Sequence, residues 1–179
     1  MPYSLRSALL LVVILLAASI TVSHGFEVSP EDAAKYAEAK AARLQDEPLP
    51  TGDAVLQKHQ QAVGTTDAIL TAAEDMQWGL DFESVLPTSP SLDSIRNAHC
   101  LGRQAIGGQV CFHVRIEARD GSVEDRWFDV RSFLLVQVEQ QRTTSAGTFR
   151  IARRIAQYHE VNGVQMPFRI ETEVKRIAG

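Results

Sequence analysis

The sequence predicts an α+β protein in which N-terminal helices precede an antiparallel sheet. Residues 29–63 carry helix signals, whereas apolar and polar residues alternate over most of 101–176, as in strands with one buried face. Turn signals separate the alternating runs at Gly107-Gly108, Asp120-Gly121 and Asn162-Gly163. Because short turns join neighbouring antiparallel strands, we expect helices first and then a sheet of consecutive hairpins.

The composition is that of an ordinary globular domain. Of 179 residues, 45% are hydrophobic and 22% are charged, which excludes a chain that is disordered throughout. The formal net charge of −4 argues against a nucleic-acid partner, because such binding depends on a large basic surface. The length allows one main domain with a short appendage.

Residues 1–25 have the features of a secretory signal peptide. Arg6 supplies the positive start, residues 8–20 are apolar or small, and Ser23-His24-Gly25 provides small residues for cleavage. The apolar run is shorter than the roughly 20 residues that a membrane span needs, although a retained anchor is the alternative. We therefore expect export, to the periplasm of a Gram-negative-type bacterium or otherwise out of the cell. N-terminal sequencing of the exported protein should begin at Phe26; full-length chain in salt-washed membranes would contradict this.

Residues 26–52 are predicted to form a helix and a proline-containing linker. Ser29 is a typical N-cap, Pro30 fits the first helical turn, and an alanine-rich run continues to Leu44. The main domain, residues 53–179, begins with a helix that ends before Gly64. The apolar face of this second helix comprises Val55, Leu56, His59, Ala62 and Val63. A short helix over 67–73 is expected to follow.

The rest of the main domain is predicted to be mostly strand. In residues 76–82 every second residue is apolar, so that Met76, Trp78, Leu80 and Phe82 share one face. Residues 84–97 contain two prolines and four serines and are expected to form a loop. Phe112, Val114 and Ile116 alternate with polar residues in the next strand. Further strands are expected over 123–130, 134–141, 148–161 and 164–176, although 148–157 taken alone could also be helical.

Asn162-Gly163 is a strong hairpin signal that predicts the register of the last two strands. A two-residue turn there places Ile155 opposite Ile170, Gln157 opposite Phe168 and Ile151 opposite Val174. On the other face it places Arg154 opposite Glu171, so that opposite charges meet. We therefore expect Met166, Phe168 and Ile170 to point inward on one wall. Arg153 and His159 also fall on this apolar face, either as side chains at the sheet margin or as contacts to a ligand headgroup.

The other two turns make predictions about charges and cysteines. A strict two-residue turn at Asp120-Gly121 would place Glu117 opposite Glu124 and Arg115 opposite Arg126, so a longer loop or a glycine bulge is expected. The Gly107-Gly108 turn places Cys111 near Gln104 and Cys100 several residues away. Export permits a Cys100–Cys111 disulfide, but this offset exceeds the reach of one and favours two free thiols.

Four segments combine turn glycines, a strand-ending aspartate and a proline after a hairpin: 107–114, 125–129, 133–136 and 158–170. In this pattern the chain resembles bacterial exported proteins similar to the outer-membrane lipoprotein-sorting proteins, which are periplasmic carriers. The resemblance implies a curved antiparallel sheet, an open half-barrel, with the N-terminal helices packed on its concave side. Between sheet and helices it implies an apolar cavity for acyl chains. Only residues 83–100 stand where such proteins have several more strands, so the half-barrel is expected to be shortened.

The sequence offers little evidence for catalysis or metal binding. Common nucleophile, zinc-protease and phosphate-loop motifs are missing. His99, Cys100, Cys111 and His113 could ligate zinc, but their spacing matches no structural zinc pattern, so no metal or cofactor is predicted. Asp125 and Asp129 are expected to be solvated. A basic cluster at Arg150, Arg153 and Arg154 is expected to be balanced by Glu160, Glu171 and Glu173.

These observations favour a noncatalytic exported protein that binds a lipid or an acylated protein between sheet and helices. The expected ligand-binding residues are Trp78, Leu80, Phe82, Phe112, Val114, Ile116, Ile155, Met166, Phe168 and Ile170, with Arg153 and His159 at a headgroup. The alternative is a cell-envelope protein–protein interaction module with a plain packed core. Transient contact with a membrane or an envelope protein fits both, and an enzyme ranks last.

Overall fold

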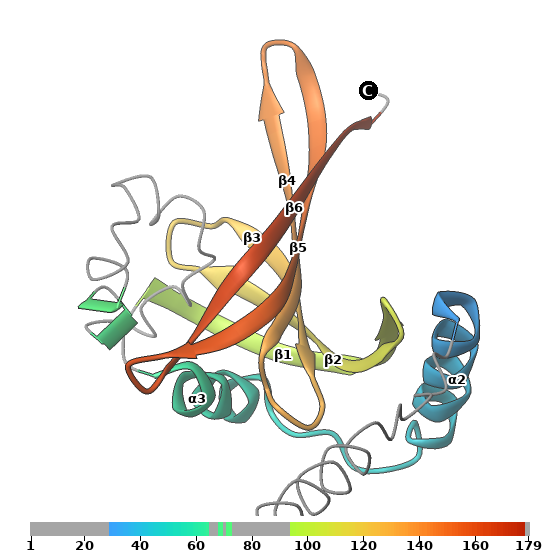
Figure 1. The fold of residues 1–179 in the computed structure, drawn as a ribbon. Helices are drawn as coiled ribbons and strands as arrows, with labels where there is room; N and C mark the ends of the chain where they lie inside the picture. The colour runs from blue at the N-terminus through green and yellow to red at the C-terminus, as the bar shows by residue number, and fades with distance from the viewer. Residues whose placement is uncertain (1–28, 65–67, 70, 73–93, 178–179) are drawn as a thin grey trace, which may run out of the picture.

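The computed structural model describes residues 29–64, 68–69, 71–72 and 94–177, and it confirms the α+β class. Two helices precede a six-stranded antiparallel sheet, in the order β1-β2-β3-β4-β5-β6, that is not closed into a barrel (Figure 1). The elements are α2 (Pro30–Arg43), α3 (Gly52–Val63), β1 (Ile95–Ile106), β2 (Gln109–Ala118), β3 (Val123–Asp129), β4 (Leu135–Thr144), β5 (Gly147–Val161) and β6 (Val164–Ile177). The predicted signal peptide and the predicted strand over 76–82 lie outside the described residues.

The helices begin at side-chain caps, as their sequences indicate. The Ser29 hydroxyl accepts a hydrogen bond from the Asp32 amide at 3.1 Å, and Pro30 opens α2. The Thr51 hydroxyl accepts one from the Ala54 amide at 3.2 Å, so α3 starts at Gly52, slightly before the predicted residue. The N-terminal residue of each helix is therefore determined by local sequence.

The last hairpin has the predicted register. Ile155 pairs with Ile170, Arg154 with Glu171 and Ile151 with Val174, which excludes the helical alternative for 148–157. Asn162 and Gly163 both have positive φ, at 51° and 79°, as a two-residue turn of this type requires.

The loop between β2 and β3 is longer than two residues, as the charge argument predicted. Gly121 has φ 85°, and the Ala118 amide donates to the Ser122 carbonyl at 2.9 Å. This arrangement places Arg115 opposite Asp125 instead of opposite another arginine. The extra residue thus turns a like-charge contact into an ion pair, with Arg115 Nε 3.1 Å from Asp125 Oδ1.

Strand β1 begins at Ile95, so the prediction of a loop through residue 97 was wrong. Residues 95–100 lack apolar alternation, but they pair with β2, which supplies the backbone hydrogen bonds that the side-chain pattern could not reveal. Cys111 pairs with Gln104, as expected, and Cys100 pairs with Val114. The two cysteines are free thiols and belong to different core clusters.

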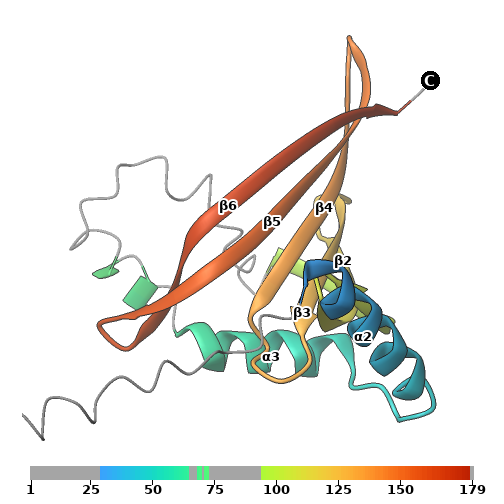
Figure 2. The same ribbon diagram turned by 45° about the vertical axis from the view of Figure 1, so that its right-hand side comes forward.

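Helix α3 crosses the sheet from one edge to the other. A Cβ on Gly52 would lie 2.4 Å from the backbone of Ala98 in β1, and one on Gly64 would lie 3.5 Å from Val164 in β6. A 12-residue helix is about 18 Å long, whereas six strands in a flat sheet span about 24 Å. The sheet therefore curves around α3, which lies on its concave side (Figure 2).

The main core lies between α3 and the sheet. It comprises Val55, Leu56, Phe112, Val114, Ile116, Phe128, Leu135, Val138 and Ile155. Helix α2 packs less extensively, through Ala37 and Ala41 against Val110. On the other face of the sheet, Cys111, Trp127 and Val136 form a separate cluster.

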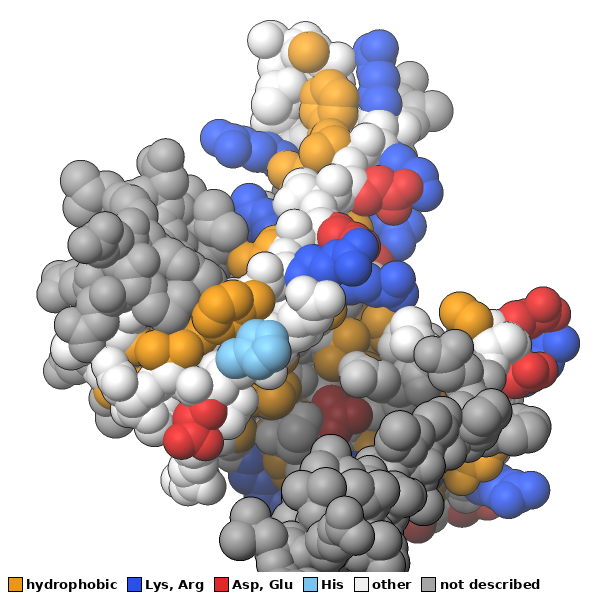
Figure 3. Space-filling model, in the orientation of Figure 1, with side chains coloured by type: hydrophobic (Ala, Val, Ile, Leu, Met, Phe, Trp, Pro, Cys, Tyr) orange, Lys and Arg blue, Asp and Glu red, His pale blue; other side chains and the backbone are white. Residues whose placement is uncertain are grey.

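Strands β4, β5 and β6 extend beyond this core as a projecting arm (Figures 1 and 2). No residue in 139–154 or 168–177 is fully buried. Hydrophobic side chains flanked by lysines and arginines cover the projecting end in the view of Figure 3. Within the described part of the chain, no helix is both long and apolar enough to cross a membrane.

Candidate functional site

The predicted ligand-binding residues do not form one surface. Phe112, Val114, Ile116 and Ile155 are buried in the main core, and Ile170 packs against it. Met166 belongs to a separate cluster with Ala72 and Val164. Trp78, Leu80 and Phe82 lie outside the described residues, so the structure does not place them.

Phe168 does not point inward, contrary to the sequence prediction. Its side chain is 46% exposed and meets the exposed His159 ring edge-on, with 4.8 Å between ring centroids. Gln157, which the hairpin register places opposite Phe168, has φ 56°, a left-handed conformation that interrupts the extended alternation of β5. As a result, Ile155 and Tyr158, three residues apart, both pack on the main core. Met166, Phe168 and Ile170 therefore do not form the expected wall.

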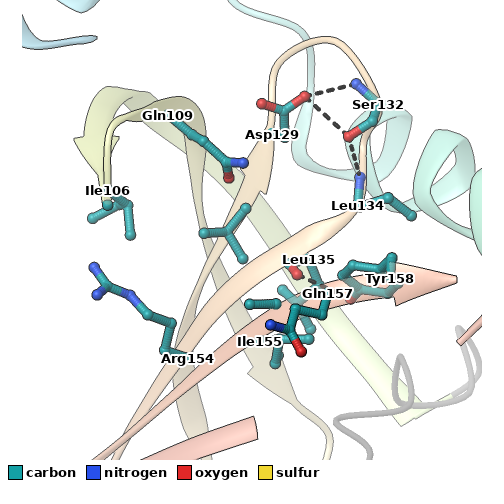
Figure 4. Close-up of a pocket in the computed structure, with 13 residues that line it drawn as sticks. Ile106, Gln109, Asp129, Ser132, Leu134, Leu135, Arg154, Ile155, Gln157 and Tyr158 are labelled. Atoms are coloured by element: carbon teal, nitrogen blue, oxygen red, sulfur yellow. Dashed lines mark hydrogen bonds between the residues drawn. The ribbon is translucent and has the colours of Figure 1, made fainter. Parts of the chain in front are cut away.

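A cavity of about 350 Å³ lies where β4 and β5 separate. The two strands pair from Gln137–Arg154 to Thr144–Gly147, whereas residues 155–161 pair with β6 alone. The lining residues are Ile106, Gly107, Gln109, Asp129, Ser132, Leu134, Leu135, Val136, Arg154, Ile155, Ala156, Gln157 and Tyr158 (Figure 4). The cavity thus joins the β1–β2 turn, the β3–β4 turn and the divergent part of β5.

The aliphatic part of the lining is contributed mainly by Leu134, Leu135, Val136 and Ile155. The Tyr158 hydroxyl donates a hydrogen bond of 2.9 Å to the Leu135 carbonyl and so bridges the two separated strands. Burial raises the pKa of Tyr158, so its hydroxyl stays protonated and keeps donating at neutral pH. This bond links β4 and β5 beside the cavity.

Arg154 is the cation of the cavity. A Cβ on Gly107 would lie 2.9 Å from its Nη2 atom, so the glycine turn allows the guanidinium to pass close over the backbone. Glu171, which faces Arg154 across the hairpin, is paired with Arg169 instead. Among the described residues Arg154 has no ion-pair partner.

The acidic residue in the cavity lining is Asp129, whose carboxylate accepts hydrogen bonds within the β3–β4 turn. Its Oδ1 atom accepts hydrogen bonds from the Arg131 amide, the Ser132 amide and the Ser132 hydroxyl, at 3.0, 2.8 and 3.0 Å. The spacing Asp129-x-x-Ser132 is a local turn signal that the sequence already contains. The proximity of Arg154 to the Gly107 turn has no comparable local signal.

A second polar group lies on the opposite face from α3. His113 Nε2 is 2.8 Å from Asp125 Oδ1, and the His113 ring stacks on Trp127 with 4.6 Å between centroids. Burial raises the pKa of Asp125, but hydrogen bonds from Arg115 and His113 outweigh this and lower it. Asp125 is therefore a partner of His113 and Arg115 and not the solvated carboxylate expected from the sequence.

Cys111 lies two residues from His113 on the same strand, which raises the question of a Cys–His–Asp nucleophile. The thiol is fully buried, and burial, followed by the nearby charge of Asp129, raises its pKa to about 12. A nucleophilic cysteine needs a lowered pKa, because the thiolate is the reactive form. Within the described ranges no three His, Cys, Asp or Glu side chains form a group that could hold a metal ion.

Comparison with known proteins identifies no relative. No protein-family model matches the chain, and no curated protein or solved structure shows significant similarity to it. The resemblance to lipoprotein-sorting proteins therefore depends on the four segments described above, and the function has to be argued from the chain's own residues.

Proposed function

We propose that the protein is an exported, noncatalytic binding protein for a small amphipathic molecule. The observation that carries the proposal is the cavity of about 350 Å³, with aliphatic side chains in its lining and Arg154 at its edge. Its volume lies at the lower end of the range for small-molecule sites, about 300–1,000 Å³. The apolar part of the ligand lies on Leu134, Val136 and Ala156, and an anionic group binds Arg154.

The proposal keeps the apolar ligand expected from the sequence but moves its position. Phe112, Val114 and Ile116 are packed in the core under α3, so they are engaged with protein side chains. The separated strands β4 and β5 instead offer aliphatic surface at a cavity. Each methylene group buried there would contribute about 0.8 kcal/mol, so a short acyl chain would bind usefully.

The charge of Arg154 supports an anionic group on the ligand. Its guanidinium can donate two parallel hydrogen bonds to a carboxylate, and the described residues provide no competing acid in an ion pair with it. The raised pKa of Cys111 argues only against this cysteine as a nucleophile, because its thiol is protonated at neutral pH.

Binding of decanoate and of decanol, measured by calorimetry, tests the proposal. We expect decanoate to bind, and we expect Arg154→Gln to weaken it about tenfold or more, since hydrogen bonds to charged groups contribute about 1.5–3 kcal/mol. Decanol, which lacks the charge, should bind more weakly and should not respond to Arg154→Gln. Ala156→Phe, which places a ring in the cavity lining, should reduce the binding of both probes.

Arg150→Gln is the matched control, because Arg150 is an exposed arginine of the same strand that is paired with Glu139 at 2.6 Å. It removes the same charge and should leave decanoate binding unchanged. Absence of binding for both probes in the folded protein would refute the proposal. If Arg154→Gln and Arg150→Gln weakened decanoate binding equally, the role of Arg154 would be refuted, but the cavity would remain the binding site.

A further inference from the structure

The register of the projecting arm sorts its charges onto two faces. We define the arm as residues 138–153 and 172–177, whose cross-strand rows run from Val138–Arg153–Thr172 outward. Cross-strand partners lie on the same face of a sheet, and alternate residues along a strand share it. One face continues the core-facing side of the sheet, because it includes Arg153, which pairs with the core residue Val138.

This core-side face contains arginines and apolar residues but no carboxylate. Its cross-strand rows are Arg142–Phe149–Arg176, Gln140–Ile151–Val174 and Val138–Arg153–Thr172. Val174 is 58% exposed, and Phe149 and Ile151 are partly exposed. An exposed apolar centre is therefore surrounded by three guanidinium groups.

The acids lie on the opposite face, where they are neutralised. Arg150 pairs with Glu139 at 2.6 Å, and Lys175 pairs with Glu173 at 2.8 Å. Glu171, which shares this face with Arg154, pairs with Arg169. The sequence-based expectation that Glu171 and Glu173 balance the basic cluster is thus wrong for the core-side face.

We propose that the core-side face of the arm docks on an anionic lipid bilayer. The arm has two acids, Glu139 and Glu173, both on the opposite face, and five cations, Arg142, Arg150, Arg153, Lys175 and Arg176, in a chain whose net charge is −4. Phe149, Ile151 and Val174 enter the interface between headgroups and acyl chains, and the arginines bind lipid phosphates.

A bilayer fits this face better than a folded protein partner. The apolar area consists of three side chains, whereas a stable protein interface buries about 800 Å² on each partner with close shape complementarity. A bilayer needs no complementary shape, and apolar insertion and positive charge each contribute to the free energy of binding to it. The proposal is independent of the cavity, because none of the three core-side arginines lines it.

Vesicle binding of charge-matched variants tests the proposal. The probes are phosphatidylcholine vesicles with and without phosphatidylglycerol. Arg142→Gln/Arg176→Gln removes the two cations that flank Phe149, and Arg150→Gln/Lys175→Gln removes two cations from the corresponding row of the opposite face. We expect the first pair to reduce partitioning into anionic vesicles about 30-fold, from about fivefold for each charge at the surface, and the second pair to have a much smaller effect. Equal losses would overturn the assignment of the face.

A tryptophan in the arm gives a second readout that does not depend on how the rest of the chain meets the membrane. Val174→Trp should show a blue shift and quenching by brominated lipid in anionic vesicles, whereas Thr143→Trp on the opposite face should show neither. The proposal would be overturned if neutral vesicles quenched the fluorescence as strongly as anionic vesicles, or if neither kind of vesicle quenched it. Saturable binding of an acidic protein without vesicle binding would assign the face to a protein instead.

Discussion

Replacing Glu124 by alanine should destabilise the protein by about 3 kcal/mol, because it leaves a buried arginine without its carboxylate. Arg126 is 3% exposed, and its Nε and Nη2 atoms donate to Glu124 Oε1 at 3.1 and 2.6 Å. Its Nη1 atom is buried and has no hydrogen-bond partner among the residues that the structure describes. Burial lowers the pKa of Arg126, so the charge is held in the core mainly by Glu124. Urea unfolding at neutral pH measures the loss.

The double variant Arg126→Met/Glu124→Ala should recover most of this stability, since replacing a buried ion pair with apolar groups is often neutral or stabilising. Glu173→Ala is the control, because its pair with Lys175 is exposed and should contribute at most about 1 kcal/mol. A loss for Glu124→Ala no larger than that of the control would show that Arg126 is solvated in the folded protein.

Acidification should destabilise the protein through His59 by about 3 kcal/mol. The His59 ring is 3% exposed and lies 5.0 Å from the Phe128 ring, and its Nδ1 atom is 2.8 Å from the Phe133 carbonyl. Burial lowers the pKa of His59 to about 4, and the positive charge of Arg126 adds to this against the effect of the carbonyl. The unfolded chain has the ordinary value of about 6.5, so it binds more protons between these two values.

This contribution is therefore fully present above about pH 6.5 and is lost as the pH falls toward 4. Urea unfolding at about pH 7.5 and at about pH 4.5 should show the difference for the wild type and for His99→Gln, whose ring is exposed. His59→Gln should remove most of it. An unchanged pH dependence in His59→Gln would mean that other groups cause the acid sensitivity.

Local signals in the sequence were sufficient for the helix starts and for the hairpins. Ser29 and Pro30 fix the start of α2 because a cap satisfies the free amides of the first turn. Asn162-Gly163 fixes the β5–β6 register because a two-residue turn leaves no freedom in pairing, and each pair then determines the next. The longer β2–β3 loop followed from charges within the two strands that it joins, Arg115 and Arg126.

The candidate site could not be predicted in this way, because its residues come from the β1–β2 turn, the β3–β4 turn and β5, which are distant in the chain. Arg154 lies beside Gly107 only because the curved sheet brings the β1–β2 turn to β5. The cavity exists only because β5 leaves β4 after Arg154 and Gln157 adopts a left-handed conformation. The alternation of apolar and polar residues along one strand predicts which residues share a face, but it does not predict where neighbouring strands separate.

The same limit explains the error at Phe168. Alternation predicted that Phe168 is inside, and it is 46% exposed. The sequence by itself determined the α+β class, the hairpin order and the register of the last two strands, since these depend on contacts between near neighbours. The tertiary structure alone decided which side chains are buried and where a cavity opens, because both depend on sheet curvature, which sums small twists over all six strands.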